Sequence, residues 1–128
     1  MLKTGAENSI SRILSALRVL LVPAAPGEYD LHALVACALT NAEIEFTHEA
    51  RLAPGCRADF LSGDIVIEIK KGKPQKSALL SQVKKYLACE GVSGIIVVSQ
   101  KNVSLPRSID GKIVASISLD KLWGVALP

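Results

Sequence analysis

Two carboxylates and a lysine lie close together in the sequence, in an order that a β-hairpin would bring onto one face. Gly63-Asp64 is a two-residue hairpin signal with glycine at the first central position, as a type II′ turn requires. A turn closed there places Asp59 directly opposite Glu68. Because side chains alternate along a strand, Lys70 shares the face of Glu68. We therefore expect the three side chains to meet.

This arrangement of charges favours a bound metal over an ordinary charged surface. Two carboxylates directly opposite each other repel, at a cost of about 0.2–1 kcal/mol that grows as water is excluded. A divalent cation converts this repulsion into coordination, and ligands that are all oxygen favour Mg²⁺ or Mn²⁺. A lysine at the edge can stabilise a metal-bound hydroxide or the charge that develops on phosphorus. Asp59, Glu68 and Lys70 therefore predict a metal site for phosphate chemistry, with a solvated charged face as the alternative.

The other face of the expected hairpin is apolar. Alternation along the two strands puts only apolar side chains there, so we expect this face to lie against the core. Its members are Cys56, Ala58, Phe60, Ile65, Ile67 and Ile69.

The remaining patterns predict an α/β domain in the order αβββαβ, with additions at both ends. The run Gly94–Ser99 is uninterrupted and apolar, which is typical of a central strand buried on both faces. We expect a mixed central sheet flanked by helices, in a single domain over 1–128, with 1–22 as an extra N-terminal helix and 28–99 as the core. The first expected helix begins at Ser9 or Ser11 and ends near 21, and two more helices cover 29–40 and 75–90. Besides the hairpin, the expected strands cover 44–52, 94–99 and 113–119, and a helical turn follows at 120–125.

A second pair of polar residues lies on the third expected helix. Gln82 and Tyr86 are four residues apart and therefore share one face of that helix. A glutamine amide and a phenol can both reach a phosphate oxygen or a metal-bound water. By itself such a pair is an ordinary feature of a helix surface, so its meaning depends on the hairpin.

The net charge of +3 conceals a strong asymmetry along the chain. Residues 1–69 hold 5 basic and 9 acidic residues, whereas residues 70–128 hold 10 basic and 3 acidic ones. A lysine run is usually a solvated helix face, but beside a candidate metal site it predicts a track for a phosphate backbone. Aromatic residues make up only 4%, so stacking on single-stranded bases is not indicated. The lysines of this expected track are Lys71, Lys73, Lys84 and Lys85.

Composition excludes several classes of protein. The chain has 128 residues, of which 49% are hydrophobic and 21% charged, values typical of a globular domain and not of a disordered one. No apolar run reaches the roughly 18 residues of a membrane span, and Arg12 and Arg18 interrupt the most apolar N-terminal stretch at helical spacing. The 3 isolated cysteines indicate reduced, buried thiols in a cytoplasmic protein, without a disulfide set or a zinc site.

Together these residues resemble the motif of the PD-(D/E)XK nuclease superfamily, which has the restriction-endonuclease-like fold. Asp59 and the triplet Glu68-Ile69-Lys70 match its catalytic motif, and Gln82-x-x-x-Tyr86 is similar to that of the branch with RecB-type and lambda-exonuclease-type domains. The resemblance spans about residues 28–99. Ala58 departs from it, because the family name implies proline before the aspartate.

The resemblance implies a Mg²⁺-dependent nuclease that hydrolyses DNA phosphodiesters, with exonuclease and endonuclease both open. Asp59, Glu68 and the carbonyl of Ile69 would bind the metal, and Lys70 would orient and help to deprotonate the attacking water. The resemblance also implies that an acidic residue on the helix before the strands completes the metal shell; Glu28 is preferred, with Asp30 and Glu49 as alternatives. Gln82 and Tyr86 would place the scissile phosphate, while the lysine track follows the DNA backbone.

A different class of function remains open at this stage. The same fold can serve as a non-catalytic nucleic-acid-binding or assembly module. The chain has no visible recognition domain, so a homodimer or another partner would supply specificity, and the first helix is a candidate dimer surface. For His32 and His48 we expect packing against apolar neighbours and not a catalytic role.

Overall fold

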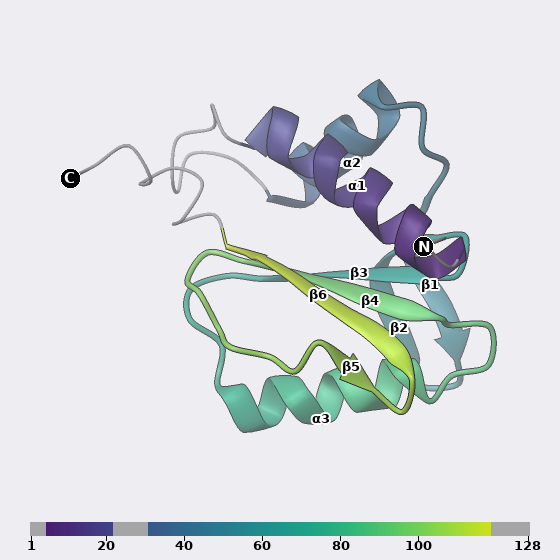
Figure 1. Ribbon diagram of the computed structural model, residues 1–128, viewed down its shortest axis with the longest axis vertical. Coiled ribbons are helices and arrows are strands. Elements are labelled where there is room, and N and C mark those ends of the chain that lie inside the picture. The colour runs from purple at the N-terminus through teal and green to yellow at the C-terminus, as the bar shows by residue number, and fades with distance from the viewer. Residues whose placement is uncertain (1–4, 22–30, 119–128) are drawn as a thin grey trace.

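The structure is a computed structural model that describes residues 5–21 and 31–118. In these ranges three helices and six strands form an α/β fold around one mixed sheet (Figure 1). The predicted succession of a helix, three strands, a helix and a strand is present, and it is preceded by the extra helix. The elements are α1 (Gly5–Leu21), α2 (Leu31–Asn41), β1 (Thr47–Ala53), β2 (Cys56–Ser62), β3 (Ile65–Lys70), α3 (Lys76–Leu87), β4 (Gly94–Ser99), β5 (Ser108–Ile109) and β6 (Lys112–Ser118).

The sheet has the strand order β1-β2-β3-β4-β6-β5. The pairs β1–β2 and β2–β3 are antiparallel, β3–β4 and β4–β6 are parallel, and β5 pairs antiparallel with β6. Every residue of β4 is buried, which confirms the central strand predicted from its unbroken apolar run. The parallel step from β3 to β4 requires a crossover, and α3 provides it.

The hairpin of β2 and β3 has the predicted register. Phe60 pairs with Ile67 and Ser62 with Ile65, so the turn closes at Gly63-Asp64. Gly63 has a φ of 60°, the left-handed value that the first central position of a type II′ turn requires. Local turn chemistry and alternation were therefore sufficient to determine this pairing.

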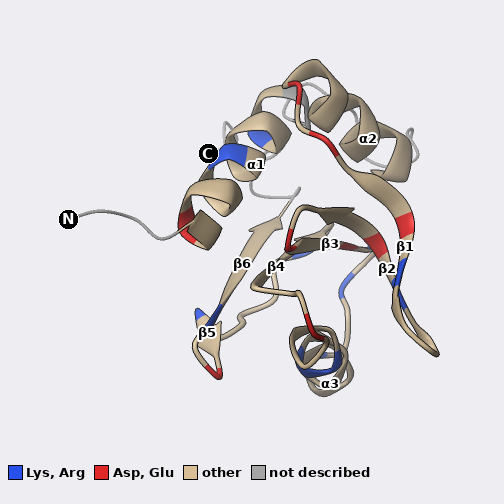
Figure 2. Cartoon of the chain, turned by 90° about the vertical axis from the view of Figure 1, so that its right-hand side faces the viewer, with Lys and Arg blue, Asp and Glu red and all other residues tan. Residues whose placement is uncertain are grey.

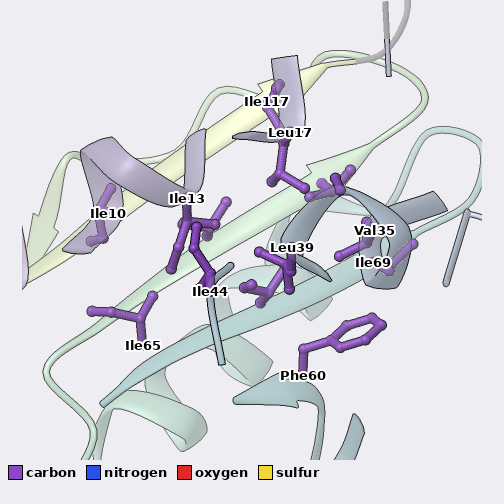
Figure 3. Close-up of a cluster of buried hydrophobic side chains, with 14 of the residues drawn as sticks. Ile10, Ile13, Leu17, Val35, Leu39, Ile44, Phe60, Ile65, Ile69 and Ile117 are labelled. Carbon is purple, nitrogen blue, oxygen red and sulfur yellow. The ribbon is translucent and has the colours of Figure 1, made fainter. Parts of the chain in front are cut away.

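Helices cover both faces of the sheet, with α1 and α2 on one face and α3 on the other (Figure 1). The apolar stripe of α1 packs into the core of its own chain, since Ile10, Ile13 and Leu17 are all buried. Figure 3 shows side chains of α1 and α2 meeting those of the sheet in this layer. A dimer formed through α1 would therefore have to use its outer face, where Val19 is 78% exposed.

The apolar face predicted for the hairpin is divided between the two layers. Four of its members pack toward α1 and α2, namely Phe60, Ile65, Ile67 and Ile69, whereas Cys56 and Ala58 pack toward α3. Strict alternation would put Ala58 and Phe60 on the same face, so β2 changes face at the residue between them, Asp59. The prediction of one continuous apolar face was wrong because it assumed a regular strand through this position.

The second helix ends later, and the first strand begins later, than predicted. The amide of Glu43 donates to the Thr40 carbonyl and that of Ile44 to the Leu39 carbonyl, while Glu43 has a φ of 58°. These bonds form a Schellman motif, whose usual apolar contact is made here by Ile44 and Leu39 in one buried cluster. Ile44 therefore caps α2 and does not start β1.

Other boundaries also differ from the predictions. Helix α1 begins at Gly5, so Ser9 and Ser11 lie inside it and do not cap it; β5 was not predicted. The helical turn expected at 120–125 lies outside the described residues. Along the described chain, no helix has both the length and the apolar character that crossing a membrane requires.

Candidate metal and phosphate site

Asp59 and Glu68 are joined by two crossed hydrogen bonds. The backbone amide of Asp59 donates to Oε1 of Glu68 at 3.1 Å. The backbone amide of Ile69 donates to Oδ2 of Asp59 at 2.7 Å. Each carboxylate thus accepts an amide of the opposite strand, just beyond the last regular pair, Phe60 and Ile67. The side chains replace the ordinary backbone pairing here, which brings the two carboxylates together as predicted.

Helix α3 adds two polar side chains to Glu68. Gln82 Nε2 donates to Oε2 of Glu68 at 3.1 Å, and the Tyr86 hydroxyl lies 2.9 Å from the same oxygen. Gln82 also donates to the Tyr86 hydroxyl at 3.2 Å, as expected for residues four apart on a helix. The sequence predicted that this pair faces the site, and its contact is with the carboxylate of Glu68.

Lys70 lies at the edge of this group. Its Nζ is 3.6 Å from Oε2 of Glu68, and its side chain is 27% exposed against 5% for Glu68. The predicted sharing of one face by Glu68 and Lys70 is therefore confirmed. A lysine in this position stays in contact with solvent while its charge is directed at the buried carboxylate.

Burial dominates the electrostatics of Glu68. Removal from water raises the pKa of its carboxyl, and the charge of Asp59 raises it further. The amide of Asp59, the Tyr86 hydroxyl and the charge of Lys70 act in the opposite direction without cancelling the increase. Burial also raises the pKa of Tyr86, with a smaller increase from the charge of Glu68, so this phenol stays protonated.

The hydrogen bonds around Tyr86 are compatible with a protonated Glu68. The Tyr86 hydroxyl has one proton but lies 2.9 Å from both the Arg57 carbonyl and Oε2 of Glu68. Both contacts are satisfied if Glu68 is protonated and donates to Tyr86, which then donates to Arg57. This chain of donors agrees with the raised pKa of Glu68. A cation bound at Glu68 would replace that proton.

The carboxylates fit a hard divalent cation. Oδ2 of Asp59 accepts the amide of Ile69, but Oδ1 accepts no hydrogen bond from any described residue, and Asp59 is only half-buried. The free oxygen of Asp59 and the carboxylate of Glu68, once its proton is displaced, form an oxygen donor set of the kind that Mg²⁺ or Mn²⁺ takes. Water and a substrate phosphate would supply the remaining ligands.

Of the three candidates to complete the metal shell, Glu49 lies among the described residues. Glu28 and Asp30 lie outside the described residues. Glu49 is opposite Asp59 on β1, because its neighbours His48 and Ala50 pair with Phe60 and Ala58, and Figure 2 shows acidic positions next to each other on β1 and β2. Among the described side chains, however, no third carboxylate, histidine or cysteine forms a metal-binding group with Asp59 and Glu68.

The backbone of Glu49 is strained. Its φ of 54° lies in the left-handed region, which costs a residue other than glycine about 1–2 kcal/mol. Glu49 is also exposed. Glu49 is opposite Asp59, the residue at which β2 changes face. Both strands are therefore irregular beside the carboxylates.

The four lysines of the expected phosphate track are all exposed. Lys71 and Lys73 lie between β3 and α3, and Lys84 and Lys85 lie in the last turn of α3. Basic residues accordingly mark α3 and the loop that leads to it in Figure 2. Helix α3 has 12 residues and begins at Lys76, so about two turns of helix, roughly 12 Å long, lie between the two pairs. Lys85 also donates to the Gly55 carbonyl at 3.1 Å.

The structure adds two contacts that the sequence did not predict. His32 Nδ1 and His48 Nε2 are 3.1 Å apart, and the His48 ring stacks on Phe60 with centroids 4.5 Å apart. The expected apolar neighbour is present, since both rings lie against Phe60, but the pairing of the histidines with each other was missed. Cys56 and Cys89 also meet, although they lie far apart in the sequence.

Comparison with known proteins gives no relative from which function can be transferred. No family model, curated protein or solved structure matches the chain. The chemistry of the site must therefore be inferred from its own residues.

Proposed function

We propose that this chain is a metal-dependent nuclease domain of the PD-(D/E)XK type, which hydrolyses DNA phosphodiester bonds with Mg²⁺ or Mn²⁺. The observation that carries the proposal is the crossed pair of Asp59 and Glu68 with Lys70 at 3.6 Å from Glu68. Two carboxylates brought together in this way, one of them buried, are costly unless a cation or a proton neutralises them.

The topology supports the same proposal. The succession α2, β1, β2, β3, α3, β4 follows the αβββαβ order of the restriction-endonuclease-like fold, with a mixed sheet between helices. The carboxylates lie on β2 and β3, and the glutamine and tyrosine lie on the helix that follows. This is the order of motifs in the RecB-type and lambda-exonuclease-type branch that the sequence resembles.

Each residue has a distinct role in the proposed reaction. Asp59, Glu68 and the Ile69 carbonyl would hold the metal, with Glu28, Asp30 or Glu49 completing its shell. The metal, when bound, supplies a Lewis acid for the phosphate and lowers the pKa of a coordinated water. Lys70 would orient that water, assist its deprotonation and stabilise the negative charge that develops on the phosphate.

Gln82 and Tyr86 act on Glu68 in this proposal, in addition to any contact with the scissile phosphate. Their two contacts with Oε2 restrict the rotation of the Glu68 side chain. They also leave the carboxylate hydrogen-bonded after it loses its proton, because the Tyr86 hydroxyl can then donate to it. A side chain that is already held in the binding orientation loses less conformational entropy when the metal binds, so the free-energy cost of binding is lower.

The proposal is tested by a cleavage screen on purified protein. Labelled linear, circular, single-stranded and branched DNA are incubated with Mg²⁺, Mn²⁺ or EDTA. We expect cleavage of at least one substrate with metal and none with EDTA. Asp59→Asn and Glu68→Gln should abolish it, while Asp64→Asn, the same kind of change in the turn of the same hairpin, should not.

The opposite result favours the other class of function. If the wild-type protein bound DNA but cleaved no substrate with either metal, the non-catalytic nucleic-acid-binding or assembly module would replace the nuclease. If Asp64→Asn and Asp59→Asn were equally impaired, the cleavage would not come from the proposed site.

A further inference from the structure

Two thiols from distant parts of the sequence meet at the end of the domain where α3 terminates. Cys56 begins β2, Cys89 follows α3, and their Sγ atoms are 3.6 Å apart although 33 positions separate them in the chain. A disulfide bond is about 2.05 Å long, so the sulfurs would need to approach by roughly 1.5 Å. Cys89 lies in the turn after α3, where its backbone amide donates to the Tyr86 carbonyl at 3.0 Å, so a rotation of its side chain closes the gap without moving this amide.

The two cysteines differ in their access to solvent. Cys56 is 5% exposed, whereas Cys89 is half-buried and its thiol lies 3.5 Å from the Lys85 carbonyl. Burial and the neighbouring thiol of Cys89 raise the pKa of Cys56. An external oxidant would therefore meet Cys89 first, and Cys56 would be the resolving thiol.

We propose that Cys56 and Cys89 form a reversible intramolecular disulfide when the protein meets a low-molecular-weight disulfide such as oxidised glutathione. The Cys89 thiolate attacks one sulfur of that disulfide and expels a glutathione thiolate. The Cys56 thiolate then attacks the Cys89 sulfur of the mixed disulfide and expels the second glutathione thiolate. Two protein thiols are oxidised to one disulfide, one glutathione disulfide is reduced to two thiols, and no further oxidant is needed.

The proposed bond would reinforce an existing contact between α3 and the first hairpin. Beside Cys56, the Arg57 carbonyl accepts the Tyr86 hydroxyl at 2.9 Å, and Lys85 donates to the Gly55 carbonyl at 3.1 Å. A covalent link at Cys89 fixes the end of α3 on the hairpin at the same place. Oxidation would consequently hold Tyr86 in the position from which it contacts Glu68.

The third cysteine provides a matched control. Cys37 is exposed on α2, and its thiol accepts a hydrogen bond from the side-chain amide of Asn41 on the same helix at 3.7 Å. Helix α2 covers the face of the sheet opposite α3. Cys37 should therefore become glutathionylated or stay free, without forming an internal bond.

The test counts thiols and does not depend on any nuclease activity. The protein is equilibrated with glutathione buffers from reduced to oxidised, quenched with acid, unfolded and labelled with a maleimide, and the linked peptides are identified by mass spectrometry. We expect two of the 3 thiols of wild type, and both remaining thiols of Cys37→Ser, to be lost together, with a peptide joining Cys56 to Cys89. Cys89→Ser and Cys56→Ala should each lose the linked peptide.

Thermal unfolding supplies a second measurement. The disulfide closes a long loop of the unfolded chain, so oxidation should raise the Tm by on the order of 10 °C in wild type and in Cys37→Ser. It should raise the Tm in neither Cys89→Ser nor Cys56→Ala. The proposal is overturned if oxidised wild-type protein carries glutathione on Cys89 without a linked peptide, or if its thiols titrate independently.

Discussion

The carboxylate of Glu68 accepts the backbone amide of Asp59 at 3.1 Å, while the carboxylate of Asp59 accepts the amide of Ile69, the residue after Glu68, at 2.7 Å. This exchange substitutes side chains for the backbone ladder of β2 and β3. It holds two acidic groups together. Among the described residues, only Lys70 forms an ion pair with one of them, Glu68.

Removing one charge from this pair should not harm the fold. Asp59→Asn and Glu68→Gln keep the side-chain volume and relieve the repulsion between the carboxylates. In EDTA we expect the free energy of unfolding to stay level or to rise by up to about 1 kcal/mol. Urea unfolding measures it, with Asp64→Asn as the control. A loss of several kcal/mol would mean that both carboxylates are structural.

The stability of the metal-free protein should fall as the pH rises. The pKa of Glu68 is higher in the folded chain than in the unfolded chain, so folding takes up a proton between these two values. This contribution is complete below the ordinary carboxyl pKa and is lost as the pH rises through the raised one. Urea unfolding in EDTA at a series of pH values should show this decline in wild type and a flatter profile in Glu68→Gln. Equal slopes would contradict it.

Metal binding should release a proton in the same range of pH. A cation at Glu68 displaces the proton that the buried carboxyl holds, so the apparent affinity for Mn²⁺ should increase with pH until the raised pKa is passed. Titration calorimetry in two buffers with different ionisation enthalpies measures the proton directly. An affinity independent of pH would show that the ion binds without Glu68.

The hydroxyl of Tyr86 should stabilise both the fold and the site. Tyr86→Phe removes a group that lies 2.9 Å from the Arg57 carbonyl and from Oε2 of Glu68, so the carbonyl loses its donor and the buried carboxyl loses a hydrogen-bond partner. We expect a loss of about 1–3 kcal/mol in the free energy of unfolding and weaker Mn²⁺ binding. Gln82→Ala, which affects a less buried side chain, should cost less stability. If Tyr86→Phe had the same free energy of unfolding and the same Mn²⁺ affinity as wild type, the role assigned to this hydroxyl would be wrong.

Lys70 should matter for the rate and not for metal binding. Its ammonium contacts Glu68 at 3.6 Å and remains partly exposed, so Lys70→Ala leaves the carboxylates in place. Because its charge is needed mainly in the transition state, we expect kcat to fall on the order of 100-fold or more. The Kd for Mn²⁺ and for DNA should change little. If Lys70→Ala cleaved DNA with the same kcat as wild type, this lysine would have no part in the mechanism.

The lysines of α3 should set the salt dependence of DNA binding. Each phosphate contact contributes a slope of about −0.9 to log K against log salt concentration. Replacing Lys84 and Lys85 by alanine should therefore flatten the slope by about 1 to 2, with the fold intact. The same change at Arg12 and Arg18, on the opposite face of the sheet, is the control. Equal slopes in both double variants would place the DNA elsewhere.

The parts of the fold that depend on neighbouring residues could be predicted from the sequence. Gly63-Asp64 and strict alternation determined the hairpin register, because a type II′ turn admits few pairings. The unbroken run of β4 determined a central strand. Local patterns were less reliable at element ends, as the Schellman motif at Glu43 and Ile44 shows, since an apolar cap has the same alternation as the start of a strand.

The sequence by itself therefore determined which residues of the site share a strand or a helix face, since covalent spacing and regular geometry are sufficient for that. Only the tertiary structure decided that Gln82 and Tyr86 meet the carboxylate of Glu68, that Ala58 and Phe60 lie on opposite faces, and that Cys56 approaches Cys89. These relations depend on how α3 docks on the sheet and on the irregular strand geometry at Asp59. Both result from the packing of segments far apart in the chain, which no local pattern encodes.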